Sequence, residues 1–447
     1  VLFHFGISAI PGGFTGVDIF FVISGYLITG SLLDDLERGQ FSIISFYWRR
    51  ARRILPALIF VTLLSCIAAL FILLPSDLHE FSLSVIAAST FWSNIYFWKT
   101  SNYFSIDAEL RPLLHTWSLS VEEQYYIFAP ILMFLIYRCF AKRWLTILLP
   151  IILGSFVLAV MATWLAPNAG FYLLPTRVWE LMLGAVLMLK RPPPLSNRFL
   201  MELVGSKRPP PLSNRFLMEL VGLAGFGLLA IGFFAISESD PFPGYNALYP
   251  CLGTALLIYV GQNSPSTIAS RILEVRPLVW IGLISYSLYL VHWPINAFAH
   301  YLSLQKLDPS MTVAMTVASF ALAAFSWKYI EQPFRQKRSF TAPVPIFAFS
   351  AGAIALLCVG GAAGALGNGF PQRFPDYAQQ RIPVGDWGNG TCFNEGSSRI
   401  ESWNIEDCTR TRGFPTTVLL WGDSFAAHYV SGLDANINQL QANIVEY

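Results

Sequence analysis

Two ionisable side chains stand beside the first membrane-length apolar run of this chain. His4 precedes the turn Pro11-Gly12-Gly13, and Asp18 lies at the start of a run that continues to Leu33. Ionisable groups at membrane depth are costly, and by default they mark functional sites. A histidine with a carboxylate partner can act as a general base toward a hydroxyl group. The alternative is a hydrogen-bonded structural histidine at a helix end.

More polar residues collect where a later apolar run begins, in His115-Thr-Trp-Ser-Leu-Ser-Val-Glu-Glu. Ser118 and Glu122 are four residues apart, so they share one face of a helix. This concentration of polar groups favours the functional interpretation of His4. We therefore expect His4 to be a base that is oriented by a carboxylate, either Glu122 or Asp18.

Four arginines stand in five positions at the start of another apolar run, in Phe46-Tyr-Trp-Arg-Arg-Ala-Arg-Arg. Such a cluster can simply anchor the cytoplasmic end of a membrane helix. It can also bind phosphate, because the guanidinium group forms bidentate contacts with phosphates. The candidate donor-binding residues are Arg49, Arg50, Arg52 and Arg53.

Three further motifs supply candidate pocket residues, each with a structural role as its alternative: the run around His292, the pair Arg177 and Glu180, and Glu331-Gln-Pro-Phe-Arg335. Pro294 follows His292 inside an apolar run, which predicts a kinked helix of the kind that lines cavities. Arg177 and Glu180 are three residues apart, so we expect them to pair on one helix. The candidate pocket residues are His115, Trp117, Arg177, Glu180, Tyr286, His292 and Glu331. We expect no metal site.

The C-terminal region is more polar and carries two features of its own. The run Thr417-Val-Leu-Leu-Trp ends in Gly-Asp-Ser424, which places a hydroxyl at a predicted strand-to-helix turn, a usual position for a nucleophile. If this region is extracytoplasmic, Cys392 and Cys408 are expected to form a disulfide. Two free thiols are the alternative.

The composition identifies the class of protein that must position these residues. The 447 residues are 54% hydrophobic and only 13% charged, whereas a soluble protein carries about 25% charged residues. Apolar runs of near 20 residues predict a mainly α polytopic bundle of about ten transmembrane helices plus one linking helix. The serine-rich run at 80–98 is expected to be re-entrant or to lie along the surface.

Basic clusters alternate with loops nearly free of Lys and Arg, which sets the predicted orientation. The arginines at 49–53 face the cytoplasm, while His4, Asp18 and His115 lie at the outer face. We expect three parts: a membrane domain at 1–335 with a truncated first helix, a linking transmembrane helix at 336–370, and the first part of an exported α/β domain at 371–447. Both ends are expected to be truncated.

Five motifs in order carry a family resemblance: GGFTGVDIFFVISGYLIT, FYWRRARRILPA, LLHTWSLSVEEQYY, ISYSLYLVHWP and YIEQPFR. From residue 1 to about 335 the chain resembles the acyltransferase-3 family of integral membrane O-acyltransferases. The tail, through VLLWGDSFAAHY, looks like the start of a fused SGNH-type esterase or acyltransferase domain. This layout is similar to that of bacterial O-antigen and peptidoglycan O-acetyltransferases.

The resemblance implies roles for individual residues. His4 matches the catalytic His of the family's Arg-x10-His motif, whose Arg would precede Val1. The arginines at 49–53 match its basic motif, with acyl-CoA contact as the implied role. Glu122 matches the acidic position after HTWSL, and Ser424 matches the SGNH nucleophile. Phe425 stands where many fused members have His, and the later blocks of that domain are not in this sequence, so a full triad cannot assemble from it.

The resemblance also implies an activity: transfer of an acyl group, expected to be acetyl, from cytoplasmic acyl-CoA to a hydroxyl of a cell-surface glycan such as O-antigen lipopolysaccharide. Peptidoglycan or exopolysaccharide is the alternative acceptor. His4 is expected either to deprotonate the acceptor or to accept the acetyl group itself, and direct transfer or relay through Ser424 both stay open. A secondary transporter and a glycan-binding membrane sensor are alternatives of other classes. We expect acetyl-CoA as donor substrate with no permanently bound cofactor, no nucleic acid partner, and a bacterial inner membrane location with a periplasmic C-terminal domain.

Overall fold

The computed structural model describes residues 1–101, 103, 106–140, 143–189, 212–264, 266–303, 307–336, 342–374, 392, 404–406, 408–410, 413–422 and 429–446. It divides into two compact units, Val1–Phe370 and Pro371–Tyr447.

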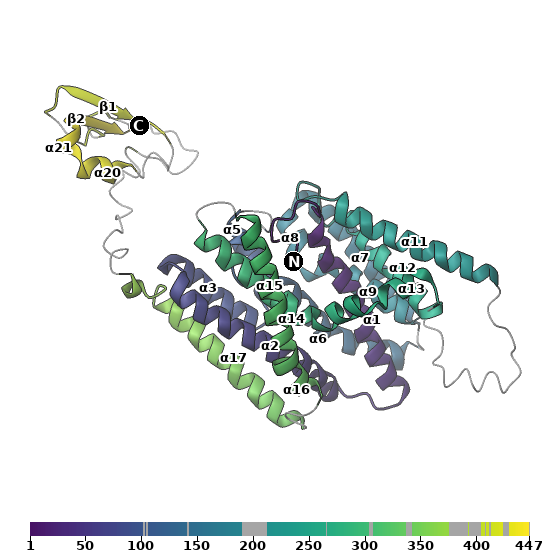
Figure 1. Ribbon diagram of the computed structural model, residues 1–447. Helices are drawn as coiled ribbons and strands as arrows, with labels where there is room; N and C mark the ends of the chain where they lie inside the picture. The colour runs from purple at the N-terminus through teal and green to yellow at the C-terminus, as the bar shows by residue number, and fades with distance from the viewer. Residues whose placement is uncertain are drawn as a thin grey trace, which may run out of the picture. The chain divides into compact units, whose positions relative to one another are not determined.

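The first unit is a helical bundle (Figure 1). Nine spans among the described residues are long and apolar enough to cross a membrane, and the chain is a polytopic membrane protein. The long helices of these spans are α1 (Gly16–Glu37), α2 (Ile43–Ile72), α6 (Thr116–Cys139), α7 (Trp144–Leu165), α9 (Leu174–Leu189), α11 (Leu212–Phe234), α14 (Arg276–Leu302), α15 (Pro309–Phe325) and α17 (Pro343–Leu366).

Shorter elements connect these helices and close the ends of the bundle. They are η1 (Gly13–Thr15), α3 (Pro75–Ser89), α4 (Ser93–Thr100), α5 (Ile106–Glu109), α8 (Pro167–Tyr172), α12 (Leu248–Asn263), α13 (Ile268–Leu273), the π-helix η2 (Ser326–Glu331) and α16 (Gln332–Arg335). The 16 residues of α12 give a rise of about 24 Å, which is shorter than the hydrocarbon core of about 30 Å.

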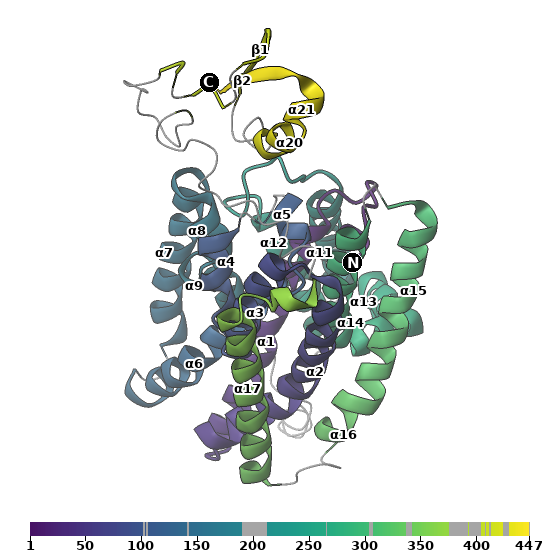
Figure 2. The same cartoon turned by 90° about the vertical axis from the view of Figure 1, so that its left-hand side faces the viewer.

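The serine-rich run at 80–98 does not form one crossing helix, as expected from its composition. Helix α3 ends at Ser89 and α4 begins at Ser93, and Phe91 between them has a φ of 58°. A positive φ in a bulky residue interrupts a right-handed helix. Helix α3 packs along α17, and both lie beside α2 (Figure 2).

Two glycines let α1 and α9 pack with their backbones in contact. A Cβ on Gly25 would lie 1.7 Å from the carbonyl oxygen of Leu181, and one on Gly184 would lie 2.0 Å from that of Val22. Small residues permit this close approach between membrane helices. The crossing brings the start of α1, with Asp18, beside the start of α9, with Arg177 and Glu180.

The second unit contains two parallel strands, β1 (Thr416–Leu420) and β2 (Ala442–Glu446), with Val418 opposite Ile444. Between them in sequence lie α20 (Val430–Ala435) and α21 (Ile437–Leu440), since a parallel pair needs a crossover connection. The short helix η3 (Pro371–Arg373) begins this unit. A disulfide joins Cys392 to Cys408. Ser424 lies outside the described residues.

Candidate active site

A cavity of about 290 Å³ opens at one end of the bundle, between the amino-terminal segment, the start of α6 and the middle of α14. Three sequence-predicted histidines line this cavity together with aromatic residues from several elements, and the residues that matter for its chemistry are His4, His115, His292, Trp117, Tyr286 and Tyr289. We call it the histidine cavity. It brings together five of the residues selected from the sequence, and Tyr289 is the addition.

The three imidazoles lie close together although they come from distant parts of the sequence. The ring centre of His292 is 5.6 Å from that of His4 and 6.2 Å from that of His115. The indole of Trp293 packs against His4, with ring centres 4.6 Å apart, and faces His115 at 6.4 Å. This geometry makes the cluster a candidate for proton transfer, because each imidazole has a ring nitrogen that can accept a proton and one that can donate a proton.

Backbone contacts set the tautomer of His292. Its Nδ1 atom lies 2.7 Å from the carbonyl oxygen of Tyr289 and 3.1 Å from that of Leu288. Because a carbonyl oxygen only accepts, Nδ1 carries the proton and Nε2 keeps its lone pair. His292 therefore offers the cavity a hydrogen-bond acceptor.

Burial lowers the pKa of the other two imidazoles, which favours their neutral forms. Burial lowers the pKa of His115 to about 3. The carbonyl oxygen of Leu290 opposes part of this shift. That oxygen has no backbone N–H donor within the helix, because Pro294 lacks an N–H group. No described residue makes a hydrogen bond of good geometry to either ring nitrogen of His115. Burial also lowers the pKa of His4 well below its usual range. A neutral imidazole is the form that can act as a base.

Tyr289 connects α14 to α6 at the wall of the cavity. Its hydroxyl lies 2.9 Å from the Ser118 hydroxyl and donates to the carbonyl oxygen of His115. Tyr289 is not one of the candidate pocket residues predicted from the sequence. The spacing of Tyr286, Tyr289 and His292, three residues apart along one apolar helix, is the signal that could have found it, because such positions share a face.

Glu122 does not lie beside His4. Its carboxylate accepts hydrogen bonds from the hydroxyls of Ser24 and Tyr126, which are themselves 2.6 Å apart. Among the described residues it contacts no histidine and does not line the histidine cavity. One turn of α6 separates Glu122 from Ser118, which places it about 6 Å deeper in the bundle.

Asp18 belongs to a buried ion-pair cluster instead. Nη1 of Arg177 lies 2.8 Å from Oδ1 of Asp18 and 2.7 Å from Oε1 of Glu180, and all three side chains are fully buried. The expected pairing of Arg177 with Glu180 is present, and Asp18 joins it from α1. Neither predicted carboxylate orients His4, so the expectation of a carboxylate–histidine pair there does not match the described contacts.

Aromatic rings enclose the guanidinium of Arg177. Its central carbon lies 5.6 Å from the ring centre of Trp117, 5.2 Å from Phe171 and 5.5 Å from Phe242. Trp117 also lines the histidine cavity. The cluster therefore supports the cavity wall from behind rather than facing the cavity.

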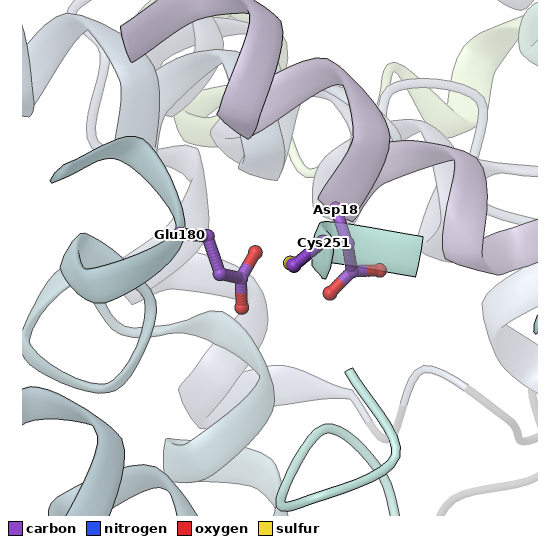
Figure 3. Close-up of side chains that lie close together, drawn as sticks. All are labelled: Asp18, Glu180 and Cys251. Atoms are coloured by element: carbon purple, nitrogen blue, oxygen red, sulfur yellow. The ribbon is translucent and has the colours of Figure 1, made fainter. Parts of the chain in front are cut away.

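Cys251 completes the group shown in Figure 3. Ligand-type atoms of Asp18, Glu180 and Cys251 lie within 4.8 Å of one another. Arg177 already bridges the two carboxylates and supplies the positive charge that a cation would bring. The cluster is accounted for as an ion pair.

The four arginines divide into two kinds. Arg49 pairs with Asp35, and Arg52 donates to the carbonyl oxygens of Phe334 and Arg335. Arg50 lies against the rings of Phe46 and Tyr126, at 5.9 and 6.0 Å. No described residue hydrogen-bonds the guanidinium of Arg50 or Arg53, which interact electrostatically with Glu122 and Glu123.

Glu331, the last candidate pocket residue, lies away from the histidine cavity. Its carboxylate pairs with Arg335 at 2.8 Å and accepts a hydrogen bond from the Ser287 hydroxyl at 3.2 Å. These contacts fix the π-helix η2 against α14, which is a structural role.

Comparison with known proteins adds the family. Residues 1–328 match the model of the acyltransferase domain. The chain is 32% identical over 346 residues to a protein named O-acetyltransferase OatA from Staphylococcus aureus strain NCTC 8325 / PS 47, and equally to that of strain COL; the match covers 75% of this chain and 55% of each relative. The chain thus spans about half the length of these relatives. No solved structure matches it. By its sequence, the chain belongs to the acyltransferase domain family.

Proposed function

We propose that this protein is a membrane O-acyltransferase that carries an acetyl group from cytoplasmic acetyl-CoA to a hydroxyl of a cell-surface glycan. The family and the relatives named O-acetyltransferase support the reaction type. The observation that carries the proposal is the histidine cavity, in which three imidazoles gather at one end of a bundle that has arginines toward its other end.

One hydrogen bond joins the wall of the histidine cavity to the helix that carries the arginines. Tyr286 lines the histidine cavity, and its hydroxyl donates to the carbonyl oxygen of Ile54 at 2.9 Å. Ile54 directly follows Arg53 in α2. A donor whose phosphates are held by Arg50 and Arg53 would therefore extend its thioester toward Tyr286 and the imidazoles beyond.

The proposed chemistry needs only the chain's own groups. Nε2 of His4 removes the proton of the acceptor hydroxyl while the hydroxyl oxygen attacks the thioester carbonyl carbon. The carbon–sulfur bond breaks, and the leaving thiolate takes the proton from the His4 imidazolium. The products are the acetyl ester and free CoA, so His4 ends the cycle neutral. His115 and His292 border the same space and are placed to hold the acceptor hydroxyl.

We propose a sidedness for the two clusters that rests on the alternation of basic loops along the sequence. The arginines face the cytoplasmic donor pool, and the histidine cavity faces the outer side, which for a bacterial inner membrane protein is the periplasm. The second unit is then exported, where a disulfide between Cys392 and Cys408 is stable. Ser424 in that unit is a proposed relay nucleophile, and direct transfer from the cavity is the alternative route.

For the acceptor we propose O-antigen lipopolysaccharide, with peptidoglycan or exopolysaccharide as the alternative. The test is acetyl transfer in proteoliposomes that contain the full-length protein, [14C]acetyl-CoA and surface polysaccharide from a strain lacking the gene. Wild-type protein should label the polysaccharide, and His4→Ala should abolish labelling. His300→Gln, which changes a histidine outside the cavity, is the matched control. Normal labelling by His4→Ala would contradict the assignment.

The same assay separates the other classes. Solute uptake by the proteoliposomes without acetyl-CoA would indicate a transporter. Polysaccharide binding with no label transferred by the wild-type protein would indicate a sensor.

A further inference from the structure

A second cavity, of about 220 Å³, lies at the same end of the bundle as the histidine cavity. It is formed where α2 meets α3, together with α4, the segment 110–112 and the last turn of α14. The charged and aromatic side chains that line it include Asp77, Glu80, Phe81, Tyr96, Arg111 and Tyr301.

The polar groups of this cavity are held in place by one another. The Tyr301 hydroxyl donates to Asp77 at 2.5 Å, and the Tyr96 hydroxyl donates to Glu80 at 2.9 Å. The guanidinium of Arg111 donates to the Thr100 hydroxyl at 3.0 Å. Each carboxylate oxygen and guanidinium has further hydrogen-bonding capacity beyond these contacts.

This combination suits a sugar better than the other ligands of a membrane surface. Sugar hydroxyls both donate and accept, so they can bond carboxylates and a guanidinium in one site, while aromatic rings pack on the apolar C–H face of the sugar. Two carboxylates against one guanidinium disfavour a phosphate group. The polar rim disfavours an acyl chain.

The second cavity is separated from the histidine cavity by a single wall. Nε1 of Trp293 donates to the carbonyl oxygen of Arg111 at 2.8 Å, and the Trp293 indole also packs against His4, with ring centres 4.6 Å apart. Arg111 lines the second cavity and His4 lines the first. One residue layer therefore lies between the two spaces, a separation that neighbouring units of one glycan chain can span.

We propose that the second cavity is a subsite for an uncharged sugar unit next to the one that receives the acetyl group, so that the protein selects a glycan chain rather than a single sugar. The proposal rests on the proposed function. It names Glu80, Arg111 and Tyr301 as groups that determine acceptor length.

The test compares acceptors of two sizes. Surface polysaccharide from a strain lacking the gene is hydrolysed and separated into single sugars and oligosaccharides, and each fraction is offered to full-length protein with acetyl-CoA. Leu110→Trp, which fills the second cavity, and Glu80→Gln should raise KM for the oligosaccharides about tenfold. Both should leave KM for acetyl-CoA and the rate with single sugars unchanged. Leu252→Trp and Glu274→Gln are the controls, since they lie on other parts of the surface.

A second measurement keeps the two proposals apart. Binding of the oligosaccharide fraction to wild-type and Leu110→Trp protein is followed by saturation-transfer NMR, which needs no acetyl transfer. The wild type could bind the oligosaccharide without transferring acetyl, while Leu110→Trp fails to bind it. That result would overturn the proposed function but would support a sugar-binding subsite. Equal KM values and equal binding for wild type and Leu110→Trp would overturn the subsite. An equal loss with single sugars and oligosaccharides would also overturn it.

Discussion

The imidazole of His4 lies 5.6 Å, centre to centre, from that of His292, and the Nδ1 proton of His292 is held by backbone carbonyls. The nitrogen that His292 leaves for the cavity is therefore an acceptor, as is the basic nitrogen of His4. Two such rings can hold one hydroxyl proton between them.

If the two imidazoles act as a unit, their substitutions should not add. His4→Ala and His292→Ala are each expected to lower acetyl transfer by about 10³-fold, within the usual range for general base catalysis. The double variant should be no slower than the slower single variant. Initial rates of label transfer give the comparison, with His79→Gln as a histidine control. A further thousandfold loss in the double variant would show independent roles.

The rate should be insensitive to mild acid. Because burial lowers the pKa of His4 well below its usual value of about 6.5, the base is already neutral at pH 6.5 and above. We expect kcat/KM to stay level between about pH 6.5 and 8 and to fall only in stronger acid, as the base becomes protonated. A fall with a midpoint at or above about pH 6.5 would contradict an unprotonated buried His4.

His115 should make the folded protein sensitive to acid. Its pKa is about 3 when folded and about 6.5 when unfolded, so between these values the unfolded state binds the extra proton. Stability from this group is thus present above about pH 6.5 and lost as the pH falls. At pH 5 this lowers the unfolding free energy of the wild type by about 2 kcal/mol, and His115→Phe should not show this decrease. Thermal unfolding in detergent at pH 5 and 8 measures it; an identical pH slope in both proteins would count against the prediction.

Removing Arg177 should be more damaging than removing an exposed arginine. Arg177→Gln leaves Asp18 and Glu180 buried without their shared cation, which is expected to cost about 3–5 kcal/mol of unfolding free energy. Arg177→Gln combined with Asp18→Asn should recover part of the loss. Thermal unfolding followed by size-exclusion chromatography reports both effects, and Arg271→Gln is the exposed control. Wild-type stability in Arg177→Gln would refute the role of the ion pair.

The contact between α1 and α9 makes a steric prediction. Gly25→Ala would place a methyl group 1.7 Å from the carbonyl oxygen of Leu181, so the helices must separate, at a cost of at least about 1–3 kcal/mol. Gly227→Ala in α11 is the control, because nothing lies within 4 Å of that position and alanine is the better helix former. Similar melting temperatures for the two variants would show that α1 and α9 can adjust freely.

Much of the fold could be predicted from local sequence, because a membrane helix must bury its backbone polar groups within one apolar run. The break within 80–98 and the pairing of Arg177 with Glu180 also depend on neighbouring residues alone. The positions of Glu122 and Asp18 relative to His4 depend on tertiary packing, so neighbouring residues do not predict them. Helical spacing places Ser118 and Glu122 on one face of α6, but it does not say which of them reaches the level of His4.

The pairing of Asp18 with Arg177 could not be predicted from the sequence either. Arg177 meets Asp18 only because Gly25 and Gly184 allow α1 and α9 to approach closely, and a contact of this kind depends on tertiary packing. The hydrophobic periodicity of α1 or of α9 does not indicate which helix packs against it. Tyr289, in contrast, lies within the motif around His292. It was not predicted to line the cavity because the sequence does not show which groups its hydroxyl contacts.

The placement of Glu122 and Asp18 away from His4 has an effect on the timing of the proposed reaction. An imidazolium with no resident anion beside it is poorly stabilised, so it gives up its proton readily. The departing CoA sulfur, as a thiolate whose conjugate thiol has a pKa of about 8.5, is the stronger base of the two. The positive charge on His4 is therefore brief, and the site returns to its resting state as soon as the donor is spent.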